Sequence, residues 1–159
     1  MGLPMLLGEE IHVVPALAPA DISSDTYTDV IGFKEYHNIQ ILVMFGAITG
    51  DTVTLTVEEC DDTTPSNSTA IAFKYRKSSA VGTDSMGAVS SATTSGITVS
   101  ATDDNKVILV EVDPATLTRG YPYIRVKLAP GGSISACFVG AVAILVPRYP
   151  QTSQLSAVD

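Results

Sequence analysis

The sequence predicts an all-β protein, a jelly-roll β-sandwich with an extended N-terminal arm. Apolar residues recur at every second position in several short segments, which is the period of a half-buried strand. Turn-forming residues separate these segments at intervals of about 8 to 15 residues, and helical signals are confined to one short segment. About eight to ten strands in a chain of 159 residues fit a double Greek key in one domain.

The N-terminal region is expected to be an arm. Residues 1–30 carry Pro4, Pro15 and Pro19 among apolar side chains, a composition that disfavours helix and predicts an extended segment with short strands. The remaining chain is expected to comprise the sandwich and a polar C-terminal tail, at residues 31–150 and 151–159 respectively.

The first long strand is expected at residues 36–48, where apolar side chains fall on both faces and predict burial on both. A turn at Gly50 and Asp51 follows. Residues 51–60 then alternate valine and leucine against threonine, the cleanest strand pattern in the chain. In the first of these strands Ile39, Ile41, Val43 and Phe45 fall on one face, and Leu42 and Met44 on the other.

The middle of the chain contains a second strand pattern and a weakly specified stretch. Residues 61–69 are dense in turn formers. Residues 70–77 alternate apolar and basic side chains at strand period. Residues 78–95 consist largely of small and hydroxyl residues, so any strand there is weakly specified.

The C-terminal half is expected to hold strands at 97–100 and 106–112, joined by a turn whose Asp and Asn tolerate positive φ. Asp113 at an N-cap position, Pro114 after it and Gly120 beyond predict a single helical turn. Two further strands are expected, at 121–130 and 133–146.

Composition disfavours several functions. The net charge is −8, the wrong sign for neutralising phosphate backbones or anionic lipid, so we expect neither nucleic-acid nor membrane binding. The N-terminus lacks the basic region of a signal peptide, and the longest apolar stretch is too short to span a bilayer. Cys60 and Cys137 match no metal-binding spacing and are expected to be free, buried thiols.

Catalytic groups are scarce. His12 and His37 have no nucleophile at a suitable spacing. Glu58 and Glu59 are adjacent on a strand and therefore point to opposite faces. The run from Asp103 to Asn105 lacks the pattern of a calcium loop. We therefore expect no enzyme activity, no catalytic residues, no metal and no cofactor.

The surface points towards assembly. A chain with 16% charged residues and apolar side chains on both faces of several strands is expected to bury some of its surface between subunits. The basic residues Lys74, Arg76 and Lys77 form the one concentrated positive patch, which suits either solvent or an acidic partner. The residues expected at interfaces are Leu3, Met5, Leu6 and Leu7 in the arm, Lys74, Arg76, Arg148 and Tyr149.

The order AIAFKYR, a Ser/Gly/Thr-rich segment, KVILVEVDPATLTRGYPYIRVKL and a long apolar strand ending ILVPRYP resembles the small structural proteins of tailed bacteriophage virions. Within that group it is most similar to head decoration, or cement, proteins with a jelly-roll core, over roughly residues 36–150. The resemblance implies a homo-oligomer, usually a trimer, that is assembled in the host cytoplasm and binds the major capsid protein on the capsid exterior.

Two alternatives remain open at this stage. One is a carbohydrate-binding or host-adhesion jelly roll that would use Tyr36, Tyr75, Tyr121 or Tyr123 as a sugar platform. The other is a structural protein of the tail or baseplate, because a fold does not fix a function. A metal-dependent enzyme of the cupin type would need a histidine cluster that the chain does not provide.

Overall fold

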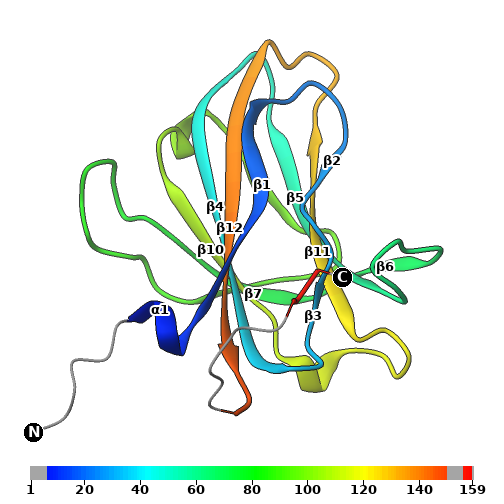
Figure 1. The fold of residues 1–159 in the computed structure, drawn as a ribbon. Coiled ribbons are helices and arrows are strands. Elements are labelled where there is room, and N and C mark those ends of the chain that lie inside the picture. Colours follow the sequence, from blue (N-terminus) through cyan, green and yellow to red (C-terminus); the bar gives the residue numbers. More distant parts are fainter. Residues whose placement is uncertain (1–6, 150–155, 159) are drawn as a thin grey trace, which may run out of the picture.

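The structure, a computed structural model, describes residues 7–149 and 156–158 and is built almost wholly of β-strands (Figure 1). The elements are α1 (Leu7–Glu10), β1 (His12–Asp21), β2 (Thr26–Tyr27), β3 (Ile31–Gly32), β4 (Tyr36–Thr49), β5 (Val53–Cys60), β6 (Ser68–Ile71), β7 (Phe73–Lys77), β8 (Ser90–Ala92), β9 (Ile97–Val99), the 3₁₀ turn η1 (Ala101–Asp103), β10 (Val107–Glu111), the 3₁₀ turn η2 (Pro114–Thr116), β11 (Tyr123–Pro130) and β12 (Ala136–Pro147).

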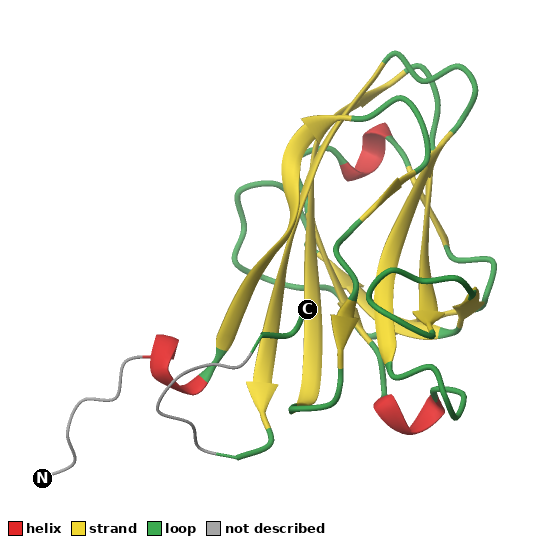
Figure 2. Cartoon of the chain, turned by 45° about the vertical axis from the view of Figure 1, so that its right-hand side comes forward, coloured by secondary structure: helices red, strands yellow, loops and turns green. Residues whose placement is uncertain are grey.

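Two antiparallel sheets pack face to face, and Figure 2 shows them as two layers. Sheet A has the strand order β1-β12-β4-β10-β7-β8. Sheet B has the order β2-β11-β5-β6, with β3 alongside β11 and β9 alongside β5. The predicted β-sandwich is confirmed.

The strand order is that of a jelly roll. The eight principal strands in chain order are β1, β2, β4, β5, β6, β10, β11 and β12. The first, eighth, third and sixth of them lie side by side in sheet A, and the second, seventh, fourth and fifth in sheet B. This is the arrangement that two Greek keys produce. β7 and β8 extend sheet A beyond β10.

The core lies between the sheets because each strand contributes every second side chain. In β5, Val53, Leu55 and Val57 are fully buried, as their alternation with threonine predicts. Val57 pairs with Val126 of β11, and Leu55 with Leu128, so two apolar rows meet in sheet B.

β4 differs from its prediction on one face. Ile39, Ile41 and Val43 are buried in the core, as expected, but Met44 is 59% exposed and Leu42 is only half-buried. The expectation of burial on both faces is therefore wrong. Nothing in the described chain covers the outer side of sheet A, whereas the inner side packs against sheet B.

The N-terminal region also differs from the expected arm. Residues 12–21 form β1, a strand of ten residues that pairs with β12 at the edge of sheet A. Val14 and Ala16 of β1 belong to the core. Proline is compatible with this placement because an edge strand needs to donate hydrogen bonds on one side only. Leu3, Met5 and Leu6 lie outside the described residues.

The predicted helical turn is confirmed as η2. Asp113 caps it by accepting a hydrogen bond from the Ala115 amide at 2.9 Å, and Pro114 is its first residue. α1 and η1 are additional short helices, and η1 occupies the turn expected after residue 100. Asn105 in that turn has φ of 56°, as predicted. Among the described residues, no helix is long and apolar enough to cross a membrane.

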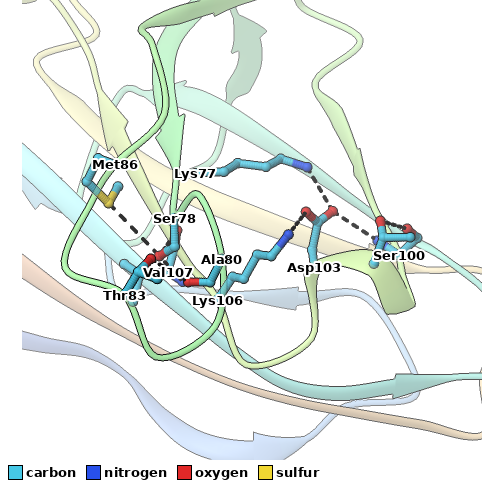
Figure 3. A network of polar contacts seen from close by, with 10 residues as sticks. Lys77, Ser78, Ala80, Thr83, Met86, Ser100, Asp103, Lys106 and Val107 are labelled. Atoms are coloured by element: carbon cyan, nitrogen blue, oxygen red, sulfur yellow. Dashed lines mark hydrogen bonds and ion pairs between the residues drawn. The ribbon is translucent and has the colours of Figure 1, made fainter.

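Asp103 is the centre of an ion-pair network at this turn (Figure 3). Its Oδ2 lies 2.8 Å from the Lys77 Nζ, and its Oδ1 lies 4.0 Å from the Lys106 Nζ. Nearby, the Ser78 hydroxyl accepts a hydrogen bond from the Val107 amide at 3.1 Å. These contacts hold the start of the long β7–β8 loop against β10.

Candidate interaction surfaces

The two histidines lie apart and have separate structural partners. His12 Nδ1 is 2.5 Å from the Tyr36 hydroxyl, and burial raises the pKa of Tyr36. His37 Nδ1 is 3.1 Å from the Pro147 carbonyl oxygen. Within the described residues, no group of three or more His, Cys, Asp or Glu side chains is arranged to hold a metal ion.

Carboxylates that are adjacent in the sequence have different partners in the structure. Glu58 points outwards from sheet B to Arg125, whereas Glu59 is buried and accepts a hydrogen bond from the Thr118 amide at 2.8 Å. The opposite orientations confirm the prediction for adjacent strand residues. Asp104 accepts a hydrogen bond from the Ile48 amide, while Asp103 binds lysines. These pairs do not form a two-carboxylate site.

The tyrosines proposed as a sugar platform do not share an exposed face. Tyr36 is 1% exposed and lies in the core. Tyr75 is half-buried and packs against the core from sheet A. Tyr123 belongs to sheet B and lies over Gly32, where a Cβ would be 2.9 Å from its ring. Tyr121 is in the loop before β11. The four tyrosines therefore do not gather into one exposed platform.

The outer side of sheet A carries a continuous patch of apolar side chains. Val142, Leu42 and Leu109 are cross-strand neighbours on β12, β4 and β10. Met44 pairs with Val107 in the next row. We call this patch the apolar face; it consists of Val13, Leu42, Met44, Val107, Leu109, Phe138, Val142 and Ile144.

Several members of the apolar face are well exposed. Met44 is 59% exposed, Val13 and Phe138 are each 51% exposed, and Val142 is 37% exposed. Gly46 leaves room for Phe138, since a Cβ there would lie 3.0 Å from the Phe138 Cβ. The apolar face therefore rests on packed residues beneath it. Within the described residues, its outer side chains remain exposed to solvent.

Lys74 and Arg76 border the apolar face. They lie on β7, opposite Glu111 and Leu109 of β10, and both are exposed. Lys77 points the other way, to Asp103, so the expected basic patch is split. Figure 3 shows Lys77 directed at the Asp103 carboxylate.

The outer side of sheet B is polar and its charges are paired. The Arg125 Nε donates to the Glu58 Oε2 at 2.8 Å, and its guanidinium lies 4.1 Å from the centre of the Tyr27 ring. Lys127 lies 2.8 Å from Asp25. A face of this kind is stable in water, whereas exposing the apolar face has a hydrophobic cost.

The remaining interface predictions fall elsewhere. Arg148 and Tyr149 follow β12 at one end of the sandwich, and Tyr149 is 72% exposed. Leu7 begins α1. Sequence reasoning missed Met44, Phe138 and Val142 as interface candidates. The available signal was the apolar character of both faces of the two longest strands.

An open cleft of about 600 Å³ lies where β4 begins and β10 ends. Its apolar floor includes Phe73 and Val112. Two of its polar groups are already engaged: Glu111 accepts from the Gln40 amide at 2.6 Å, and Asp113 caps η2.

Comparisons with known proteins give little guidance. No protein-family model and no curated protein matches the sequence. One solved structure that is similar, titled "Structure of infectious bursal disease virus Gx strain", shares 9% identity, with a TM-score of 0.23. The alignment covers 88% of this chain and 41% of that chain.

Proposed function

We propose that the protein is a non-enzymatic structural subunit that associates with further copies of itself through the apolar face. The observation that carries this proposal is the contrast between the two outer faces. Sheet B presents paired charges, while sheet A presents exposed Met44, Phe138 and Val142 with no charge among them. Two copies of a chain with a net charge of −8 repel each other at a distance, so an uncharged face is the favourable place for contact.

The size of the face predicts weak pairwise association. Four strands spaced by about 4.8 Å and about six residues long give a patch of roughly 20 Å by 20 Å. This is about half of the ~800 Å² that each partner contributes to a standard interface. Single contacts of this size are weak, but repeated contacts on a lattice add up to firm attachment.

We further propose that the protein belongs to the head of a tailed bacteriophage and binds the major capsid protein on the capsid exterior. The resemblance of residues 36–150 to decoration proteins supports this assignment. The acidic balance is consistent with it, because packaged DNA would repel the chain from the interior. The trimer expected from the resemblance is part of the same proposal.

Sedimentation velocity over a range of about 5 to 500 micromolar tests the self-association. We expect the sedimentation coefficient of the native chain to rise with concentration. Replacing Met44→Lys and Val142→Lys together should abolish this rise. Thr98→Lys, which adds one of these two positive charges, is the control, because Thr98 is an exposed strand residue on the outer side of sheet B.

Two outcomes would contradict the proposal. One is a native chain that sediments as a monomer at every concentration. The other is an equal loss of association in the Thr98→Lys control. Co-sedimentation with decoration-free head shells tests the location, and absence of the protein from the shell pellet would remove the assignment to the capsid exterior.

A further inference from the structure

Several cations in this acidic protein have no carboxylate partner. The chain has nine Lys and Arg residues against seventeen Asp and Glu residues, so carboxylates are in excess. Within the described residues, Lys74, Arg76, Arg119 and Arg148 nevertheless form no ion pair. The other five cations, Lys34, Lys77, Lys106, Arg125 and Lys127, each lie within 4.0 Å of a carboxylate oxygen.

Two of the unpaired arginines share a cleft with a further lysine. Lys34, Arg119 and Arg148 line a cleft of about 350 Å³ at the end of the sandwich that carries η2. This is the lower end in Figure 2. The other lining residues are Phe33, Pro114, Leu117, Thr118, Gly120, Tyr121 and Pro122, and no Asp or Glu is among them.

The three cations have free capacity to bind an anion. The Arg148 Nε and Nη2 both donate to the Phe33 carbonyl oxygen, at 3.4 and 3.3 Å, which orients the guanidinium and leaves its other N–H groups available. Lys34 lies 3.9 Å from Glu35 but its side chain is 87% exposed, so this pair is weak. Arg119 is exposed.

Hydrogen bonds hold the loop that carries Arg119 in place. The buried Glu59 carboxylate accepts a hydrogen bond from the Thr118 amide at 2.8 Å, and the Tyr121 amide donates to the Thr118 carbonyl at 2.9 Å. The Phe33 amide donates to the Pro122 carbonyl at 3.0 Å, which joins this loop to the segment that carries Lys34. The cations are therefore presented by an ordered frame.

We propose that this cationic cleft binds an acidic polypeptide segment of a partner protein. Arginine matches carboxylates through parallel N–H donors, and three separate cations suit a chain with several carboxylates. The apolar lining, which includes Leu117 and Tyr121, suits the side chains between those carboxylates. A nucleic acid is disfavoured because its phosphates extend well beyond this cleft, over the surface of a protein whose net charge is −8, whereas a short acidic segment can place its carboxylates within the cleft.

The cleft is a different surface from the apolar face. It is formed by the β3–β4 turn, the loop before β11 and the residue after β12, none of which contributes to the apolar face. Acidic-peptide binding can thus be measured on a Met44→Lys, Val142→Lys chain. If self-association is not observed, the cleft proposal still stands. If acidic-peptide binding is not observed, the self-association proposal still stands.

The experiment is a titration of the ¹⁵N-labelled protein with a short, acetylated and amidated oligo-aspartate peptide. We expect shifted amide signals at Lys34 and at residues 117–121, with little change along β7. Arg119→Gln should weaken binding by about two- to fivefold, the range for loss of one exposed ion pair. Arg76→Gln is the matched control, because it removes the same charge from an exposed, unpaired arginine on β7.

Three results would overturn the proposal. Signals that shift mainly along β7 would place the acidic peptide elsewhere. Equal effects of Arg119→Gln and Arg76→Gln would indicate general charge attraction. Inorganic phosphate that binds as tightly as the oligo-aspartate peptide, or an oligo-asparagine peptide that does so, would exclude recognition of a carboxylate chain. Arg148 is left unchanged because it also holds the Phe33 carbonyl.

Discussion

The Lys77 Nζ lies 2.8 Å from the Asp103 Oδ2, and this contact joins the end of β7 to the η1 turn. Both side chains are largely shielded, with 27% of Lys77 and 9% of Asp103 exposed. Partial burial makes such a pair costly to break, because the remaining charge keeps its desolvation without its partner.

Asp103→Asn is therefore expected to destabilise the fold by about 1 to 3 kcal/mol. The change leaves Lys77 and Lys106 without their shared carboxylate. Urea unfolding followed by circular dichroism measures the loss. Asp84→Asn, at an exposed loop position, is the control, and an equal effect of both changes would refute the structural role of Asp103.

Asp51 should contribute to the way the free energy of unfolding falls at acid pH. Amide groups of Thr52 and Ser133 donate to its carboxylate at 2.8 and 3.2 Å and lower its pKa in the folded state. A lowered folded pKa stabilises the protein above the unfolded pKa of about 3.9, and this contribution is lost as the pH falls through the folded pKa. Asp51→Asn should flatten the loss of stability below about pH 4.

Unfolding free energies of the native chain and Asp51→Asn across the acid range test this expectation. Parallel curves for the two proteins would show that the hydrogen bonds to Asp51 do not stabilise the charged form. The Asp84→Asn chain serves again as the reference for removal of one exposed carboxylate.

The two cysteines should be inert in the folded protein. Both are free and fully buried, as predicted, and burial raises the pKa of each thiol to about 11. Because the thiolate is the reactive form, a disulfide reagent near neutral pH should label Cys60 and Cys137 only after unfolding. The sign of the shift also predicts lower stability as the pH rises from the unfolded thiol pKa towards about 11. Rapid labelling without denaturant would contradict the burial.

Gly50 is expected to resist substitution. Its φ is 91°, and a Cβ would lie 2.3 Å from the Ser133 carbonyl oxygen. Gly50→Ala should cost at least about 1 to 3 kcal/mol, since both the backbone conformation and the space exclude a side chain. Gly132→Ala in the neighbouring turn is the matched control, because no atom lies within 4 Å of the added Cβ. Thermal unfolding of both variants decides the comparison, and equal melting temperatures would refute it.

Strand positions were predictable wherever one face alternated with polar residues. The alternation in β5 and the cap at Asp113 depend on nearest neighbours in sequence, so the local pattern was sufficient. β1 was not identified as a full strand because Pro15 and Pro19 indicate an arm when read locally. Its place at a sheet edge, where proline is tolerated, depends on pairing with a strand far along the chain.

The surfaces were only partly predictable, because they too depend on contacts between segments that are distant in the sequence. The outward direction of Lys74 and Arg76 followed from strand period. Periodicity could not tell whether the second apolar side of β4 would be covered, so Met44 was expected to be buried. The cationic cleft gathers Lys34, Arg119 and Arg148 from three distant segments, and no local motif marks it.

The prolines of β1 have a consequence for how copies of this protein can join. The pairing of β1 with β12 shifts in register on both sides of Leu17, next to Pro15 and Pro19, so the outer rim of β1 offers an irregular row of hydrogen-bonding groups. A second strand cannot extend the sheet there in register. Growth into filaments by strand pairing is therefore disfavoured at this rim, and copies that associate are expected to do so through the faces of their sheets.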